Sequence, residues 1–134
     1  MKNTRVLSLK NLSKRFGTVV ANNSVNIDLY RGEVLSLLGE NGAGKTTLMN
    51  MLFGHYVPDN GSIDVLGEDG KMEPLTLGHP QASLDAGIGM VHQHFTLAEN
   101  LTVLDNVLLG SEKIWAWRHD HLNARNKITK IMDK

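Results

Sequence analysis

The chain has 134 residues, enough for one small domain with a modest core. Its 14 basic and 14 acidic residues cancel, which argues against a nucleic-acid-binding surface, because such surfaces carry a strong basic excess. There is no cysteine, so a disulfide framework and a thiolate metal site are excluded. The polar N-terminus and the absence of any long apolar run predict neither a signal peptide nor a membrane span.

The first third of the chain predicts strands joined by turns. Residues 6–12 alternate apolar and polar side chains, as a half-buried strand does. A turn at Phe16-Gly17 precedes further strand over residues 19–29, with a break near Asn22-Asn23. A tight turn at residues 31–33 then leads into the apolar run 34–38, which predicts a buried strand.

A glycine-rich segment follows this apolar run and leads into a helix expected over about residues 45–53, closed by Gly54. Its sequence matches G-x-x-x-x-G-K-[ST] and reads Gly39-Glu40-Asn41-Gly42-Ala43-Gly44-Lys45-Thr46-Thr47. A strand, a loop of this pattern and a helix together predict a phosphate-binding site. The three glycines are expected to take positive φ and so bring successive N–H groups close to the phosphates.

The remaining residues of the loop fit a nucleoside triphosphate. Unpaired N–H groups and the helix dipole favour an anion at the helix N-terminus. Lys45 is expected to supply a positive charge to the β- and γ-phosphates, and Thr46 to give its hydroxyl to Mg²⁺. The Thr47 hydroxyl is placed to reach a phosphate as well.

The rest of the chain predicts a mixture of short elements. In order, we expect a turn at 58–61, a strand at 62–67, a loop over 68–84 with a short helix near 80–85, a second buried strand at 87–91, a helix over 102–109 with Thr102 as N-cap, and a polar helix over 121–133.

Several motifs now occur in one order and spacing. They are Phe16-Gly17, the glycine-rich loop, Gly54-x-x-x-Pro58-Asp59-x-Gly61, the segment Ile88-Gly89-Met90-Val91-His92-Gln93, and Leu101-Thr102-Val103 with Asn106-Val107. This series resembles the N-terminal part of an ABC-type ATPase domain, over nearly the whole chain. The resemblance implies an α/β fold, a P-loop NTPase core with an antiparallel N-terminal β-subdomain, truncated before the signature motif. It implies one partial domain over residues 1–134, in which the β-subdomain and P-loop core extend to about residue 95 and a helical subdomain starts over about 96–134.

The resemblance also implies roles for two further residues. The residue matching Phe16 usually stacks on adenine, and phenylalanine keeps the π-face of the more common tyrosine. Gln93 matches a glutamine that touches Mg²⁺ or the attacking water and links the ATP site to a transmembrane partner. The implied cofactors are therefore ATP and Mg²⁺, with Thr46 and Gln93 as the metal ligands.

Two segments, Gly39-Glu40-Asn41-Gly42 and Met90-Val91-His92-Gln93-His94-Phe95, resemble those of importers of simple sugars and nucleosides. That resemblance implies transmembrane permease subunits and a second ABC domain as partners, and a place on the cytoplasmic face of the membrane. Trp115 and Trp117 fit either a contact with the permease or packing in the helical subdomain.

Three motifs that ABC ATPases need for hydrolysis do not occur in the sequence: a glycine-rich signature, an apolar strand ending in Asp-Glu, and a switch histidine. We therefore expect ATP binding, no catalytic residue within this chain, and no hydrolysis by it alone. The alternatives are a soluble ABC protein without a membrane partner and a non-catalytic nucleotide-binding fragment. Exposed apolar faces of an incomplete sheet predict marginal stability.

Overall fold

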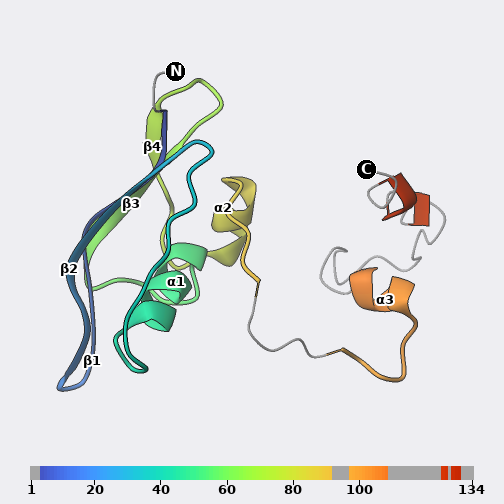
Figure 1. Cartoon of the computed structure of the whole chain (residues 1–134), viewed down its shortest axis with the longest axis horizontal. Helices are drawn as coiled ribbons and strands as arrows, with labels where there is room; N and C mark the ends of the chain where they lie inside the picture. The colour runs from blue at the N-terminus through green and yellow to red at the C-terminus, as the bar shows by residue number, and fades with distance from the viewer. Residues whose placement is uncertain (1–3, 92–96, 109–124, 127, 131–134) are drawn as a thin grey trace. The chain divides into compact units, whose positions relative to one another are not determined.

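The computed structural model describes residues 4–91, 97–108, 125–126 and 128–130. The chain divides into two compact units, Met1–Val91 and His92–Lys134. The elements of the first unit are β1 (Arg5–Phe16), β2 (Val19–Tyr30), α1 (Lys45–Phe53), β3 (Asn60–Leu66), β4 (Met72–Pro74) and α2 (Pro80–Asp85) (Figure 1). In the second unit, α3 spans Val103–Leu108.

The strands form one antiparallel sheet in the order β2-β1-β3-β4. Leu9 of β1 lies opposite Ile27 of β2 on one side and Ile63 of β3 on the other. The long β1–β2 hairpin turns at Gly17, which has a φ of 58°. This sheet is the antiparallel β-subdomain that the sequence resemblance implied.

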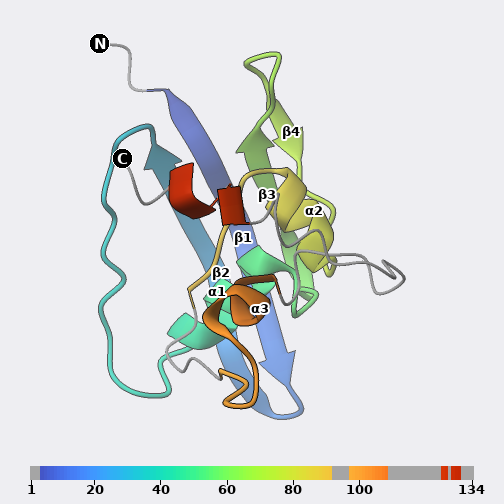
Figure 2. The same ribbon diagram turned by 90° about the vertical axis from the view of Figure 1, so that its right-hand side faces the viewer.

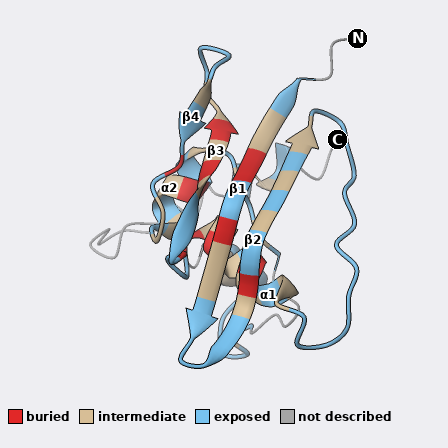
Figure 3. Cartoon of the chain, turned by 90° about the vertical axis from the view of Figure 1, so that its left-hand side faces the viewer, coloured by how far each residue is buried: buried red, intermediate tan, exposed pale blue. Residues whose placement is uncertain are grey.

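A bulge in β1 sets which residues face the core. Asn11 has a φ of 50°, and the pairing register shifts around it, between Leu9 and Leu12 against β2 and between Lys10 and Ser13 against β3. The extra residue turns the strand so that Leu9 and Leu12, three positions apart, are both buried (Figure 3). A regular strand would place residues three positions apart on opposite faces.

Helices α1 and α2 cover one face of the sheet (Figures 1 and 2). Leu48 and Met51 of α1 complete a core whose other members are Leu9, Leu12, Ile63 and Leu75. The Ser83 hydroxyl of α2 is fully buried and donates a hydrogen bond to the Leu52 carbonyl of α1 at 3.1 Å. The two helices are therefore joined at the C-terminal turn of α1.

Most of the predicted elements are confirmed. The helix expected over about 45–53 is α1 and ends at Gly54, with a φ of 89°. In α3, the Asp105 N–H donates to the Thr102 hydroxyl at 3.2 Å, which confirms Thr102 as the N-cap. Residues 125–126 and 128–130 are helical, as predicted within 121–133. Strand β4 was missed, because three residues that end in proline carry no alternation signal.

Two predicted buried strands are wrong. Residues 34–38 and 87–91 form no strand in the structure. Val34, Leu38 and Val91 expose 93%, 90% and 82% of their surface. A strand needs a neighbour for its backbone hydrogen bonds, and within residues 4–91 the sheet places none beside either segment. The parallel part of the expected P-loop core is thus not assembled among the described residues.

Among the residues that the structure describes, none of the helices has the length and apolar character needed to cross a membrane.

Candidate nucleotide-binding site

The glycine-rich loop connects β2 to α1 through an exposed segment, since residues 31–40 are all exposed. Gly42 and Gly44 have φ values of 86° and 84°, a backbone conformation that only glycine adopts without strain. The same expectation for Gly39 is wrong, because its φ is not positive and a Cβ there would make ordinary contacts with Ala43 and Lys45. The curvature of the loop therefore comes from its last two glycines.

At Gly44 the loop touches the sheet. A Cβ on this residue would lie 2.1 Å from the Ala21 carbonyl oxygen of β2 and 3.0 Å from the Asn22 Nδ2. The Asn22 side chain also donates to the Gly44 carbonyl at 3.4 Å. Because no other residue type leaves this space free, Gly44 lets β2 support the point at which the loop becomes α1.

The Lys45 side chain folds back into the loop. Its Nζ donates to the carbonyl oxygens of Gly39 and Glu40, both at 2.6 Å. The Ala43 N–H also donates to the Glu40 carbonyl, at 3.2 Å. The ammonium group is therefore already at the centre of the loop that Gly39 opens and Lys45 closes.

The N-terminus of α1 has the properties of an anion site. Its first turn holds Lys45, Thr46 and Thr47 and contains no acidic residue. In the described part of the chain, no side chain caps this end of the helix. The N–H groups of a first turn lack intrahelical acceptors, so they are available to phosphate oxygens. The exposed Thr46 hydroxyl at this end is a hard oxygen ligand of the kind that Mg²⁺ prefers.

Phe16 lies at the end of β1 with its ring held by two neighbours. The Tyr56 ring meets it edge-on, with centroids 5.5 Å apart and an interplanar angle of 72°. The Lys14 ammonium lies 5.6 Å from the Phe16 ring centroid and 2.9 Å from an Asp59 carboxylate oxygen. Phe16 remains 45% exposed, which leaves part of the ring open to a flat ligand.

One strand connects the predicted aromatic contact to the loop. Phe16 pairs with Val19 at the start of β2, and the same strand reaches Gly44 at Ala21 and Asn22. The β1–β2 hairpin therefore presents Phe16 and supports the glycine-rich loop.

Asp59 anchors the segment beside Phe16. The hydrogen bond from Lys14 is the main reason that the pKa of Asp59 lies below its ordinary value of 3.8, and a second bond from the Arg15 N–H lowers it further. Asp59 is therefore an anion that holds Lys14 beside the aromatic ring.

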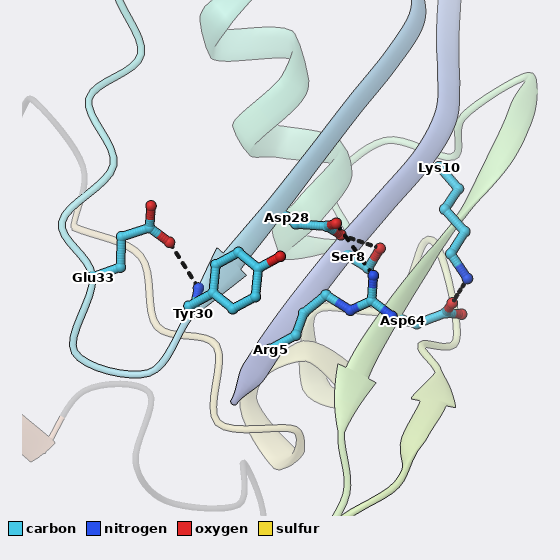
Figure 4. Close-up of polar contacts among 7 residues, drawn as sticks. All are labelled: Arg5, Ser8, Lys10, Asp28, Tyr30, Glu33 and Asp64. Carbon is cyan, nitrogen blue, oxygen red and sulfur yellow. Dashed lines mark hydrogen bonds and ion pairs between the residues drawn. The ribbon is translucent and has the colours of Figure 1, made fainter. Parts of the chain in front are cut away.

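A second polar region lies on the sheet near the start of β1 (Figure 4). It surrounds a depression of about 230 Å³ whose charged residues pair with one another. Asp28 accepts from Ser8 at 2.6 Å and from Arg5 at 3.2 Å, and Lys10 pairs with Asp64 at 2.6 Å. The Ser8 hydrogen bond is the first cause of a lowered pKa at Asp28. Because these charges satisfy one another, we assign this region to the stability of the sheet.

At the turn after β2, also drawn in Figure 4, the Tyr30 N–H donates to the Glu33 carboxylate at 2.8 Å. This bond fixes the direction in which the chain leaves the sheet toward the glycine-rich loop.

Sequence reasoning missed three residues at the site. Ala21 and Asn22 contact the loop, and Tyr56 contacts Phe16. The available signal was Asn22, where the sequence predicted a break; that break is wrong, because β2 continues from Val19 to Tyr30. Gln93 lies outside the described residues.

Comparison with known proteins places the chain among ATP-binding proteins of transporters. A family model described as ABC transporter matches residues 22–134. The guanosine import ATP-binding protein NupO of Bacillus subtilis is 43% identical over 129 residues, which cover 96% of this chain and 24% of that protein. The glucose import ATP-binding protein TsgD13 of Haloferax volcanii is 50% identical over 107 residues, covering 80% of this chain and 18% of that protein.

The solved structures that resemble this chain are also ATP-binding cassettes of ABC transporters. The ATP-binding cassette MJ1267 of an ABC transporter superimposes with a TM-score of 0.72 at 25% identity, covering 96% of this chain and 54% of that one. A nucleotide-free ATP-binding cassette from an ABC transporter gives a TM-score of 0.66 at 30% identity. The match covers 90% of this chain and 44% of that one. The chain spans about a quarter or less of the length of NupO and TsgD13.

Proposed function

The chain belongs to the ABC transporter family, and from that membership we propose that residues 39–47 bind the phosphates of ATP as part of an importer ATPase. The geometry of the loop carries the proposal. Two glycines with positive φ, a lysine ammonium at the loop centre and an uncapped helix N-terminus converge there. Each of these features favours a dense negative charge.

Each residue of the loop has a role in this proposal. Lys45 exchanges its two backbone carbonyl partners for β- and γ-phosphate oxygens. The backbone N–H groups between Gly42 and Thr47 donate to the phosphates, and the chain from Glu40 to Ala43 holds the loop closed. Thr46 and Gln93 hold Mg²⁺, which neutralises phosphate charge when bound. Phe16 stacks on the adenine ring.

The process that this chain serves is inferred from the names of its relatives. NupO and TsgD13 are named for the import of guanosine and glucose, so we propose that this chain serves import of a small sugar or nucleoside. Its partners are then permease subunits and a second ABC domain, on the cytoplasmic face of the membrane. We place hydrolysis in that complete assembly, because the sequence contains no Asp-Glu pair to supply a metal ligand and base.

Nucleotide binding is tested by titrating the purified chain with a fluorescent ATP analogue and Mg²⁺. Lys45→Ala should weaken binding about ten- to a hundredfold, since a hydrogen bond to a charged group contributes about 1.5–3 kcal/mol. Lys71→Ala is the matched control, because that lysine is 82% exposed and pairs only with nearby Asp69 in the described structure. Equal affinity in wild type and Lys45→Ala would refute the proposed phosphate site.

The metal assignment has its own test. Thr46→Val keeps the branched shape and removes the hydroxyl. We expect it to abolish most of the gain in affinity that Mg²⁺ gives the wild type, while binding without Mg²⁺ changes little. An unchanged Mg²⁺ dependence would remove Thr46 from the metal site.

The importer assignment is tested by purifying the tagged chain from detergent-solubilised membranes of its own cells. An integral membrane permease should co-purify. Recovery of the chain only in the soluble fraction, under conditions in which a known importer ATPase stays with its permease, would favour a protein that works without a membrane partner.

A further inference from the structure

Asn22 is polar, and it is the only residue of β2 that is buried. It exposes only 7% of its surface, and its Oδ1 has no hydrogen-bond partner among the described residues. A buried acceptor without a donor is destabilising, because it loses its contact with water and gains nothing in return. A leucine of similar size would avoid that cost. The amide is thus unexplained by the packing of the strand.

The other end of the amide explains its presence. Asn22 Nδ2 donates to the Gly44 carbonyl at 3.4 Å. That carbonyl does not need Asn22 for satisfaction, because it also accepts the Leu48 N–H at 2.9 Å within the start of α1. The contact therefore adds a lateral link from the sheet to a carbonyl that the helix already satisfies.

The link acts on the peptide group that faces the phosphate site. The carbonyl of Gly44 and the N–H of Lys45 belong to one planar peptide unit. A hydrogen bond that fixes the direction of the carbonyl therefore fixes the direction of the N–H on its other side. The Ala21 carbonyl packs against the same glycine, so β2 restricts this peptide by contact as well as by hydrogen bonding.

We propose that Asn22 is a positioning residue for the glycine-rich loop, which holds the Gly44–Lys45 peptide in the orientation that binds phosphate. The proposal rests on the proposed function of that loop. Asn22 touches no phosphate itself and acts through Gly44. The unpartnered Oδ1 is the structural cost of placing the Nδ2 donor there.

The test compares Asn22→Leu with Asn23→Leu, the same change at the adjacent exposed residue. Asn22→Leu removes the donor together with the unpartnered oxygen. Its melting temperature should stay the same or rise, while its affinity for the ATP analogue with Mg²⁺ falls about two- to tenfold, the range for loss of one neutral hydrogen bond. Asn23→Leu should bind like the wild type.

Amide hydrogen exchange provides a readout without nucleotide. In the free protein, Asn22→Leu should exchange faster than the wild type at the Leu48 N–H, which donates to the Gly44 carbonyl, whereas Asn23→Leu should not. Asn22→Asp keeps the shape but replaces the donor by an acceptor, and should weaken binding at least as much. It takes the place of the leucine variant if that protein does not fold.

The outcomes separate the two proposals. If the wild type binds and Asn22→Leu binds equally well, the positioning role is overturned and the proposed function stands. A lower melting temperature with unchanged affinity also overturns it, because Asn22 then serves folding alone. If the wild type does not bind the analogue, the proposed function fails, and the positioning role for phosphate binding is overturned with it.

Discussion

Replacing Gly44 by alanine should be far more costly than the same replacement at Gly42. Both residues have φ values near 85°, and forcing an L-residue into this region costs about 1–2 kcal/mol. At Gly42 no described atom lies within 4 Å of the added Cβ, so the conformational cost is the whole cost. We expect Gly42→Ala to lower the free energy of unfolding by about 1–2 kcal/mol.

At Gly44 a steric cost is added. The new Cβ would lie 2.1 Å from the Ala21 carbonyl oxygen, a backbone atom that moves only if β2 moves. Overpacking of this kind costs about 1–3 kcal/mol, so the total for Gly44→Ala is about 2–5 kcal/mol. This is a large share of the roughly 5–15 kcal/mol that stabilises an ordinary domain.

Urea unfolding followed by circular dichroism measures both values. The midpoint should fall further for Gly44→Ala than for Gly42→Ala, with similar m-values, since both variants bury the same surface. Equal destabilisation of the two variants would show that β2 does not press on the loop at Gly44, and would refute the reasoning on that contact.

Three further predictions concern the hydrophobic core, the loss of stability in acid and the contact between Phe16 and adenine. Leu12→Ala should cost about 2–5 kcal/mol in urea unfolding, because Leu12 is fully buried, whereas Leu84→Ala at a 49% exposed position should cost less than about 0.5 kcal/mol. Hydrogen bonds lower the pKa values of Asp28 and Asp59 below 3.8, so their contribution to stability is present above that pH and is lost as pH falls through the lowered values. Asp28→Asn should therefore make the melting temperature less sensitive to acid below about pH 4. An unchanged dependence of the melting temperature on pH in this range would contradict this. Phe16→Leu should weaken binding of the ATP analogue but not of inorganic triphosphate, and equal losses for both ligands would argue against stacking on adenine.

The local parts of the fold were predictable from sequence because their signals are local. Helix α1 is bounded by Gly44 and Gly54, both of which take the left-handed conformation that glycine permits. Alternation over residues 6–12 identified part of β1, Phe16-Gly17 marked the turn after it, and the pattern of the glycine-rich loop located the candidate site. Each of these signals lies within about twelve residues of sequence.

The parts that could not be predicted depend on distant partners. An apolar run such as residues 34–38 indicates a tendency to be buried, but it does not say what would cover it, and here it is exposed. Strand β4 exists because it pairs with β3, and its own sequence shows no strand pattern. Asn22 reaches Gly44 across 22 positions of the chain. No window of sequence contains that contact.

The bridge from Lys45 to the carbonyls of Gly39 and Glu40 has a consequence for the rate of ligand capture. Both of these residues are exposed, so water can take over each carbonyl when the ammonium turns toward an arriving phosphate. The exchange leaves no buried group unpaired and requires no element of the sheet to move. Association should then be limited by encounter, and stopped-flow traces should show an observed rate that rises linearly with nucleotide concentration, without the plateau that a slow opening step would impose.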